Sequence, residues 1–307
     1  MIRTVLGDCR PDELGPTLVH EHLITLPAAH LRDGGDMVLD REDLAESELR
    51  RFLEAGGGAV VDMTTREMGR DPGALRRVSE RSEVSVIMAT GHICEDYWRG
   101  VIDVDAMSED DLIRSMVSDL VDGIDGVRAG VIKCGSSCDV VTDVERRVMR
   151  AAARAQQETG APIATHTTAG SMALRQLEVL VDAGAVAGKI SLGHLDRRLN
   201  WKEHLALAVE GPYLAYDCFS KDWYELDADR VAFVDRLVEA GYGRQLLASG
   251  DHARRSYQVA WGGGPGFTHI PRRIVPWLRR EGVSEEAIHD LVIANPARFL
   301  DWMPVRT

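Results

Sequence analysis

The sequence lacks an excess of basic residues and any paired cysteine motif. Its 307 residues include 36 Lys and Arg against 49 Asp and Glu, a formal net charge of −13. Nucleic-acid partners require a clustered basic surface, so this balance argues against them. The five cysteines are scattered and form no CxxC pair, which is typical of free thiols in a reducing compartment.

Long apolar runs are also missing. No stretch approaches the roughly 20 apolar residues of a membrane helix. The first residues carry charges throughout and do not resemble a secretory signal. We therefore expect a cytoplasmic protein with no membrane partner. Hydrophobic residues make up 45% of the chain, which allows a large core without disulfide bonds.

Eight short apolar segments alternate with amphipathic helical patterns. The segments are residues 17–23, 58–64, 84–91, 129–135, 162–167, 190–195, 213–218 and 245–251. Strands that are apolar throughout and separated by helices indicate a parallel sheet buried on both faces. The pattern predicts an α/β fold, a single (β/α)8 TIM barrel over residues 1–307, with an open doubly wound sheet as the alternative.

The longest irregular stretch, residues 256–271, is rich in glycine and aromatic residues. It follows the last predicted strand, and would therefore lie at the C-terminal face of the barrel, where active sites of this fold are built. Two interpretations remain open for it. One is a mobile lid or pocket wall, and the other is an ordinary surface loop.

Ionisable side chains occur at the ends of five predicted strands. His20 and His22 are two residues apart on the first strand, so both imidazoles face one side while Glu21 faces away. The other members, on the fourth, fifth, sixth and eighth strands, are Lys133, His166, His194 and Asp251. One buried histidine is more often a core residue, but this set would be costly to bury unless metal ions paired it. The ligand types favour Zn²⁺, or Mn²⁺, Co²⁺ or Fe²⁺, over Mg²⁺ and Ca²⁺.

Lys133 is the unusual member of this set. A free ammonium is a poor metal ligand, and two dications would repel it. Lys133 therefore fits only as a neutral amine, or as a carbamate formed with CO₂ that bridges two metals.

The order HxH, Lys, His, His, Asp occurs within the segments LGPTLVHEHL, AGVIKCG, ATHTTAG, SLGHLDR and LLASGD. In these segments the chain resembles the phosphotriesterase-like family of the amidohydrolase superfamily, in its phosphotriesterase-related branch. The resemblance implies two divalent metal ions at the C-terminal ends of the strands. The implied ligands are His20, His22 and Asp251 for one ion and His166 and His194 for the other. Carbamylated Lys133 would bridge the ions together with a hydroxide, and Asp251 would either take the proton of that hydroxide or serve as a ligand alone.

Three further residues are expected at the mouth of the barrel. Lys221, Arg254 and Tyr257 offer an ammonium, a guanidinium and a hydroxyl, which suits a terminal phosphate or carboxylate. They are similar in placement to the phosphate-binding residues of family members that open phosphorylated sugar lactones. The alternative is that these are solvated loop charges, with Arg197 and Arg255 as neighbouring candidates.

The loop after the third predicted strand contributes His92, Tyr97 and Trp98. An aromatic wall against the ring of a small substrate is one interpretation of these residues, and a packed loop is the other. Related sequences tend to have an aromatic residue where His92 stands, so their specificity does not transfer directly to this chain.

The resemblance therefore predicts a metal-dependent hydrolase in which the bridging hydroxide attacks a lactone or ester carbonyl. A small sugar lactone with an anionic tail is the leading substrate. A carboxylesterase or N-acyl amide hydrolase with slow phosphotriesterase activity is the main alternative. A catalytically silent binding barrel and a deaminase-like enzyme with one metal are alternatives of other kinds. The ligand is a small molecule, and a homodimer is the expected assembly.

Overall fold

The computed structural model describes residues 1–304, so the last three residues of the predicted domain lie outside the described residues. Its main sheet consists of eight strands, and neighbours in the sheet pair in parallel in chain order. The strands are β3 (Thr17–Glu21), β4 (Ala59–Asp62), β5 (Ser85–Gly91), β6 (Val131–Ser136), β7 (Ile163–Thr167), β8 (Ile190–Leu192), β9 (Tyr213–Tyr216) and β10 (Leu246–Ala248). Each predicted segment overlaps one of these strands, and the predicted (β/α)8 barrel is confirmed.

The first and last strands of the sheet meet just beyond β10. The hydroxyl of Ser249 donates to the carbonyl of His20 over 2.8 Å, and the backbone N–H of His20 lies 3.2 Å from the same hydroxyl. The backbone N–H of Asp251 also donates to the carbonyl of His20, over 3.0 Å. These bonds close the barrel at the end of β3 that carries the histidines.

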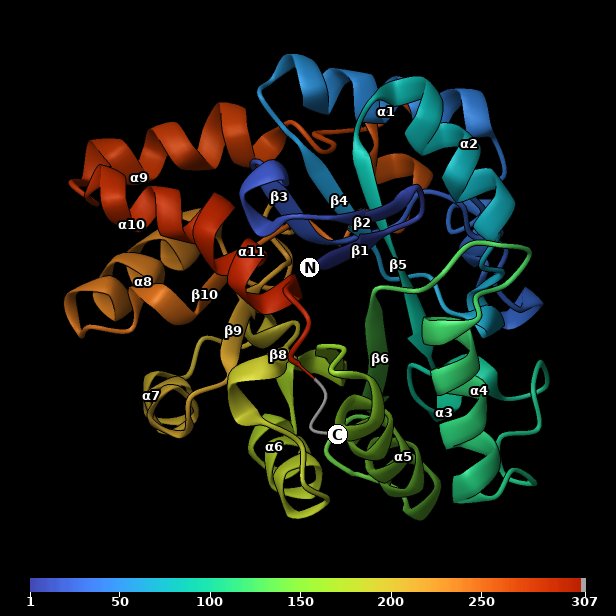
Figure 1. Ribbon diagram of the computed structural model, residues 1–307. Coiled ribbons are helices and arrows are strands. Elements are labelled where there is room, and N and C mark those ends of the chain that lie inside the picture. The colour runs from blue at the N-terminus through green and yellow to red at the C-terminus, as the bar shows by residue number, and fades with distance from the viewer. Residues whose placement is uncertain (305–307) are drawn as a thin grey trace.

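Eleven α-helices surround the barrel among the described residues (Figure 1). They are α1 (Glu42–Glu54), α2 (Pro72–Ser82), α3 (Glu95–Trp98), α4 (Glu109–Val121), α5 (Asp143–Thr159), α6 (Ala173–Asp182), α7 (Trp201–Glu210), α8 (Asp227–Glu239), α9 (Val275–Glu281), α10 (Glu285–His289) and α11 (Asn295–Leu300). The sequence marks several of their ends. Thr142 and Ser108 begin α5 and α4 with capping boxes, and Gly160 ends α5 in the left-handed conformation.

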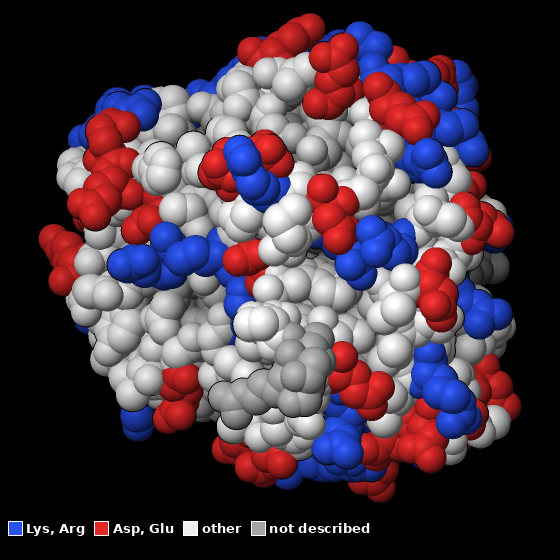
Figure 2. Space-filling model, viewed as in Figure 1, with Lys and Arg blue, Asp and Glu red and all other residues white. Residues whose placement is uncertain are grey.

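The core has two layers that follow from the alternation of side chains along the strands. Val61, Ile87, Val131 and Leu247 belong to the inner cluster that fills the barrel, and their neighbours in sequence pack outward against the helices. On the face shown in Figure 2, acidic and basic side chains are intermixed. Among residues 1–304, no helix combines the length and apolarity that crossing a membrane requires.

An N-terminal hairpin precedes the barrel. Strands β1 (Ile2–Thr4) and β2 (Gly7–Cys9) pair in an antiparallel manner, and the N–H of Val5 donates to the carbonyl of Val86 near the start of β5. Ile2 is fully buried in the inner cluster. The hairpin therefore covers the end of the barrel opposite the histidines. The sequence analysis did not predict it, because a three-residue strand carries too little periodicity to detect.

The loop of residues 256–271 is held against the body of the protein. Glu48 on α1 accepts hydrogen bonds from the backbone N–H groups of Ala260 (2.8 Å) and Phe267 (3.0 Å). The side-chain amide of Gln258 donates to the carbonyls of His22 (2.9 Å) and His252 (2.7 Å). These contacts favour a fixed wall beside the barrel mouth over a mobile lid.

Candidate metal centre and active site

His20 on β3 and His22 directly after it each direct one ring nitrogen toward Asp251. The Nδ1 atom of each ring has a hydrogen-bond partner: His20 Nδ1 donates to Asp217 Oδ2 over 2.7 Å, and His22 Nδ1 lies 2.9 Å from Thr64 Oγ1. Their Nε2 atoms lie 3.7 and 3.4 Å from Asp251 Oδ1. One nitrogen from each histidine and one oxygen of Asp251 all lie within 4.8 Å of one another. This spacing suits three ligands around one divalent ion.

The second pair of histidines lies beside the first. His194 Nε2 is 3.0 Å from His166 Nδ1, and the rings of His194 and His20 have their centroids 4.7 Å apart. Lys133 Nζ lies 3.5 Å from His20 Nε2 and 3.4 Å from the carbonyl of Thr165. The structure therefore brings together all six predicted metal ligands. We call this set the floor: His20, His22, Lys133, His166, His194 and Asp251.

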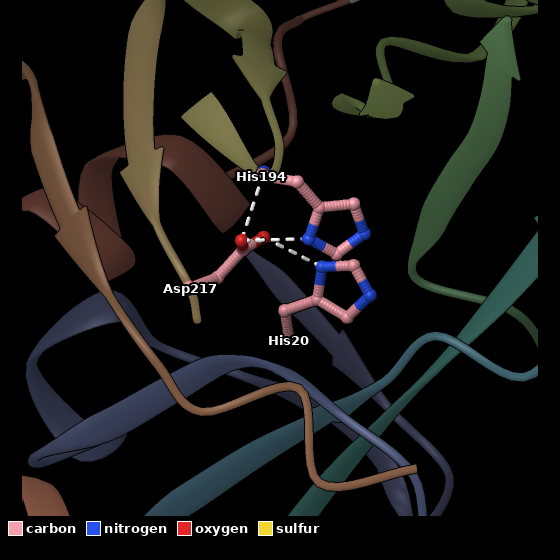
Figure 3. A group of neighbouring side chains, drawn as sticks. All are labelled: His20, His194 and Asp217. Atoms are coloured by element: carbon pink, nitrogen blue, oxygen red, sulfur yellow. Dashed lines mark hydrogen bonds and ion pairs between the residues drawn. The ribbon is translucent and has the colours of Figure 1, made fainter. Parts of the chain in front are cut away.

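Asp217 holds one histidine from each pair (Figure 3). Its Oδ2 accepts from His20 Nδ1, while its Oδ1 accepts from His194 Nδ1 (2.8 Å) and from the backbone N–H of His194 (2.8 Å). Because both oxygens already accept imidazole N–H groups, Asp217 orients the ligands and leaves the Nε2 atoms for metal. The sequence analysis missed this residue. Its position directly after β9 could have indicated it, because Asp251, another carboxylate, follows the end of β10 in a similar way.

Burial sets the protonation of the floor. It lowers the pKa of His166 well below its ordinary value and that of His194 to about 3, so both rings are neutral, as metal ligands must be. It also lowers the pKa of Lys133 to about 8, which makes the neutral amine accessible. Burial alone would raise the pKa of Asp251, but Lys221 and the nearby histidines hold it well below the ordinary range. Neutral imidazoles, an ionised carboxylate and a readily deprotonated lysine fit a pair of divalent ions.

Two floor residues adopt backbone conformations that are rare for residues other than glycine. His194 has φ 58° and Asp251 has φ 46°, both in the left-handed region. Such residues cost about 1–3 kcal/mol each and persist only where the surroundings fix them. The fully buried Glu21 supplies this support for Asp251, because it accepts from the backbone N–H groups of Gly250 (2.9 Å) and His252 (2.8 Å) on either side. Glu21, which the sequence places on the opposite side of β3 from the histidines, thus positions the last ligand.

A cavity of about 390 Å³ opens above Asp251. We call the following lining residues the rim: Tyr97, Arg197, Lys221, Tyr224, Arg254 and Tyr257. Lys221 Nζ donates to the carbonyl and to Oδ2 of Asp251, each over 2.6 Å. Arg254 forms ion pairs with Asp33 and Asp36. The structure thus places all three predicted anion-binding residues at one cavity, with both cations paired to carboxylates of the chain itself.

The remaining sequence candidates divide between the cavity and its surroundings. Tyr97 lines the cavity, and its ring stands edge-on to His166 with centroids 5.6 Å apart. His92 lies outside this cavity, with Nδ1 3.2 Å from Glu67 Oε2 and its ring edge-on to the buried Trp98. The structure therefore gives the cavity one of the three aromatic-wall candidates and packs the other two behind it.

The two neighbouring arginine candidates also separate. Arg197 lines the cavity, whereas Arg255 donates to the carbonyl of Val38 (2.6 Å) and pairs with Asp40 outside it.

Comparison with known proteins agrees with this geometry. Residues 1–300 match the model of the phosphotriesterase family. The chain belongs to the phosphotriesterase family. It is 31% identical to the phosphotriesterase homology protein of Escherichia coli over 94% of this chain and 98% of that protein. It is also 31% identical to the N-acetyltaurine hydrolase of Tetraodon nigroviridis, over 98% of both chains.

Solved structures of the family share the barrel. A lactonase from Listeria monocytogenes superposes with a TM-score of 0.95 at 30% identity and covers 99% of both chains. The Escherichia coli phosphotriesterase homology protein, complexed with phosphate in its active site, gives a TM-score of 0.90 at 30% identity over 94% of this chain and all of that one. The protein is accordingly a hydrolase of this family. The family implies a binuclear divalent metal centre, and the floor supplies candidate ligands for it.

Proposed function

We propose that this hydrolase opens a small sugar lactone that carries an anionic tail. The observation that carries the proposal is the floor itself, where six candidate ligands lie beneath a cavity lined by three cationic side chains. His20, His22 and Asp251 would hold one divalent ion, His166 and His194 the other, and Lys133 would bridge them as a carbamate. Zinc is the proposed metal, with manganese, cobalt and iron as alternatives.

The divalent ions, when bound, lower the pKa of water toward neutrality and polarise the scissile carbonyl. Side chains of the protein orient the ligands and transfer the proton. Asp217 and Thr64 fix the histidine rings, so their ligand nitrogens need no rearrangement on binding. Asp251 presents Oδ1 to the histidines, and we propose that it also takes the proton of the attacking water and passes it to the leaving group.

The rim would recognise the tail of the substrate. Arg254 lies at the outer side of the cavity, where its partner Asp33 is exposed, so a terminal phosphate can replace that carboxylate with little loss. The hydroxyl of Tyr257 would complete this contact. The Escherichia coli relative was solved with phosphate in its active site, which supports binding of an anionic group in the site of this family.

A second candidate is hydrolysis of an N-acyl amide whose amine part is anionic. The N-acetyltaurine hydrolases, which align over nearly the whole chain, favour it. Both reactions begin with attack of water on a carbonyl. They differ in the leaving group, which is an alkoxide in the lactone and an amine in the amide.

The test is a comparison of substrates on zinc- or manganese-loaded protein. Sugar lactones with and without a terminal phosphate are assayed with a pH indicator, and N-acyl amides with and without an anionic amine part are assayed for released amine. Preference for the phosphorylated lactone supports the proposal. Turnover of anionic N-acyl amides alone would establish the second candidate in its place, and turnover of neither class would contradict both.

A further inference from the structure

The three cations of the rim differ in how their hydrogen-bonding groups are used. Lys221 gives its ammonium to two oxygens of Asp251, and Arg254 is paired with two aspartates. Arg197 donates from Nε to Cys218 Sγ (3.3 Å) and from Nη2 to Asp251 Oδ2 (3.2 Å). Within residues 1–304, its Nη1 has no hydrogen-bond partner. One edge of a cationic guanidinium is therefore available at the cavity.

The guanidinium of Arg197 is held in one orientation. Its side chain is only 14% exposed, and its central carbon lies 4.9 Å from the ring centroid of Tyr224. Contacts with Cys218 and Asp251 fix the other two nitrogens. A planar group fixed at two of its three nitrogens loses little freedom when the third binds an acceptor.

Arg197 also lies closer to the floor than Arg254 does. Its Nη2 contacts Oδ2 of Asp251, while Oδ1 of the same carboxylate is 3.4 Å from His22 Nε2. The width of one carboxylate thus separates the guanidinium from the ligand nitrogens. A substrate atom bound by Arg197 must therefore be close along the molecule to the carbonyl that reacts above the floor.

The free edge favours a neutral oxygen over an anion. Cys218 and Asp251 use two of the five N–H groups of the guanidinium, so both N–H groups of Nη1 and the second N–H of Nη2 remain. The Asp251 carboxylate, which Nη2 contacts, would repel a second negative charge next to this edge. A hydroxyl oxygen can accept one hydrogen bond from Nη1 without this repulsion.

We propose that Arg197 is a specificity-determining residue that donates from Nη1 to a hydroxyl on the carbon next to the scissile carbonyl. The inference rests on the proposed function and deepens it. The preferred substrate is a 2-hydroxylated acyl compound, recognised near the reacting carbon by Arg197 and at its far end by Arg254.

The experiment compares Arg197→Lys and Arg197→Gln with wild type on two γ-lactones that differ only in the hydroxyl at carbon 2. Arg198→Gln is the matched control, because Arg198 is the next residue, is half exposed and pairs with Glu203 away from the cavity. Each Arg197 variant should lose about 10- to 100-fold in kcat/KM on the hydroxylated lactone, mainly through KM, and far less on the deoxy lactone. Metal content and Tm should stay near wild type, and Arg198→Gln should behave as wild type on both lactones.

Equal losses on the two lactones would overturn the proposal and leave Arg197 as a residue that only holds Asp251. Calorimetry of the two ring-opened acids on metal-loaded protein gives a readout without turnover. Wild type should bind the 2-hydroxy acid more tightly than the deoxy acid, and the Arg197 variants should bind both alike. If wild type opens no lactone yet shows this preference, the proposed reaction is wrong while the role of Arg197 stands. If wild type shows no preference, the role of Arg197 is wrong.

Discussion

The floor and the rim of the cavity are built in different ways. Floor residues lie on strands or within three residues after them, and buried groups such as Asp217 and Thr64 hold the histidine rings. Rim residues come from the segments that follow the strands, including the short helix α3; several are partly exposed, and Arg254 pairs with the loop carboxylate of Asp33. The difference indicates a division of labour in which the sheet fixes the metal centre and the loops select the substrate. This is the arrangement expected of a barrel whose reaction chemistry stays constant while its substrate varies.

The largest effect is expected from removing the bridge of the floor. Lys133→Ala should reduce metal content and lower kcat/KM by more than about 100-fold, beyond the range typical for groups that only support a ligand. Short-chain carboxylic acids should restore part of both, because they can replace the carbamate. Metal analysis and lactone turnover measure the change, and the exposed Lys202→Ala is the control. Full activity in Lys133→Ala would show that the floor does not depend on a lysine bridge.

The buried His204, which packs behind the floor, should make the protein less stable in acid. Burial lowers the pKa of His204 to about 4, and its Nδ1 lies 2.7 Å from the hydroxyl of Tyr216, which directly precedes Asp217. The folded state disfavours the charged ring, so this contribution is full above the unfolded pKa of about 6.5 and decreases as the pH falls toward 4. Between pH 7.5 and 4.5 the free energy of unfolding should drop by about 2.5 kcal/mol from this group alone.

Denaturant unfolding of wild type and His204→Gln at both pH values checks this expectation. The variant lacks the titrating ring, so its stability should depend less on pH by that amount. An identical pH dependence of the two proteins would show that His204 does not contribute to the acid sensitivity.

Replacing Asp217, which orients two of the ligand histidines, should have a smaller effect than replacing Lys133. Asp217→Asn retains the shape but can no longer accept from both His20 and His194 as an anion. Loss of such an orienting group typically costs about 10- to 100-fold in metal affinity or activity. Competition with a metal chelator measures the affinity, with the exposed Asp229→Asn as control. Unchanged metal affinity would show that the histidines keep their orientation without the Asp217 carboxylate.

The smallest effect is expected from replacing Arg254, at the outer side of the rim. Arg254→Ala should raise KM about 10-fold for substrates with a terminal anion and spare neutral ones, because a charge-assisted hydrogen bond is lost only with the anion. Its surface ion pairs contribute little to stability, so Tm should hardly change. Arg255→Ala, at the neighbouring position outside the cavity, is the control. Equal losses on anionic and neutral substrates would place Arg254 outside the binding set.

The contrast between floor and rim also explains what the sequence could predict. Strand periodicity determines which side chains share a face, so the HxH pair and the later strand-end residues could be grouped from the sequence alone. Asp217 obeys the same rule, and was missed because one carboxylate after a strand resembles an ordinary loop residue. Glu21 was assigned to the opposite face of β3, but its hydrogen bonds to the loop around Asp251 depend on how β10 returns to β3.

The rim could not be predicted at the same level. Its geometry depends on loop conformations and on pairings between distant loops, such as Arg254 with Asp33, that no periodicity encodes. The left-handed backbone of His194 and Asp251 is likewise a tertiary effect, since neither residue type favours it strongly enough to be inferred from sequence. Of the aromatic candidates after β5, only Tyr97 reaches the cavity, because His92 pairs with Glu67 and Trp98 is buried in the core against it.

The proposed reaction depends on two divalent ions in the floor, so metal stoichiometry is the decisive quantity. Protein stripped with a chelator, reloaded with zinc and freed of excess metal would be analysed by inductively coupled plasma mass spectrometry, alongside His166→Ala. We expect two zinc ions per wild-type chain and fewer in the variant. A stoichiometry of one or none in wild type, or of two in both proteins, would show that the floor is not the binuclear centre described above.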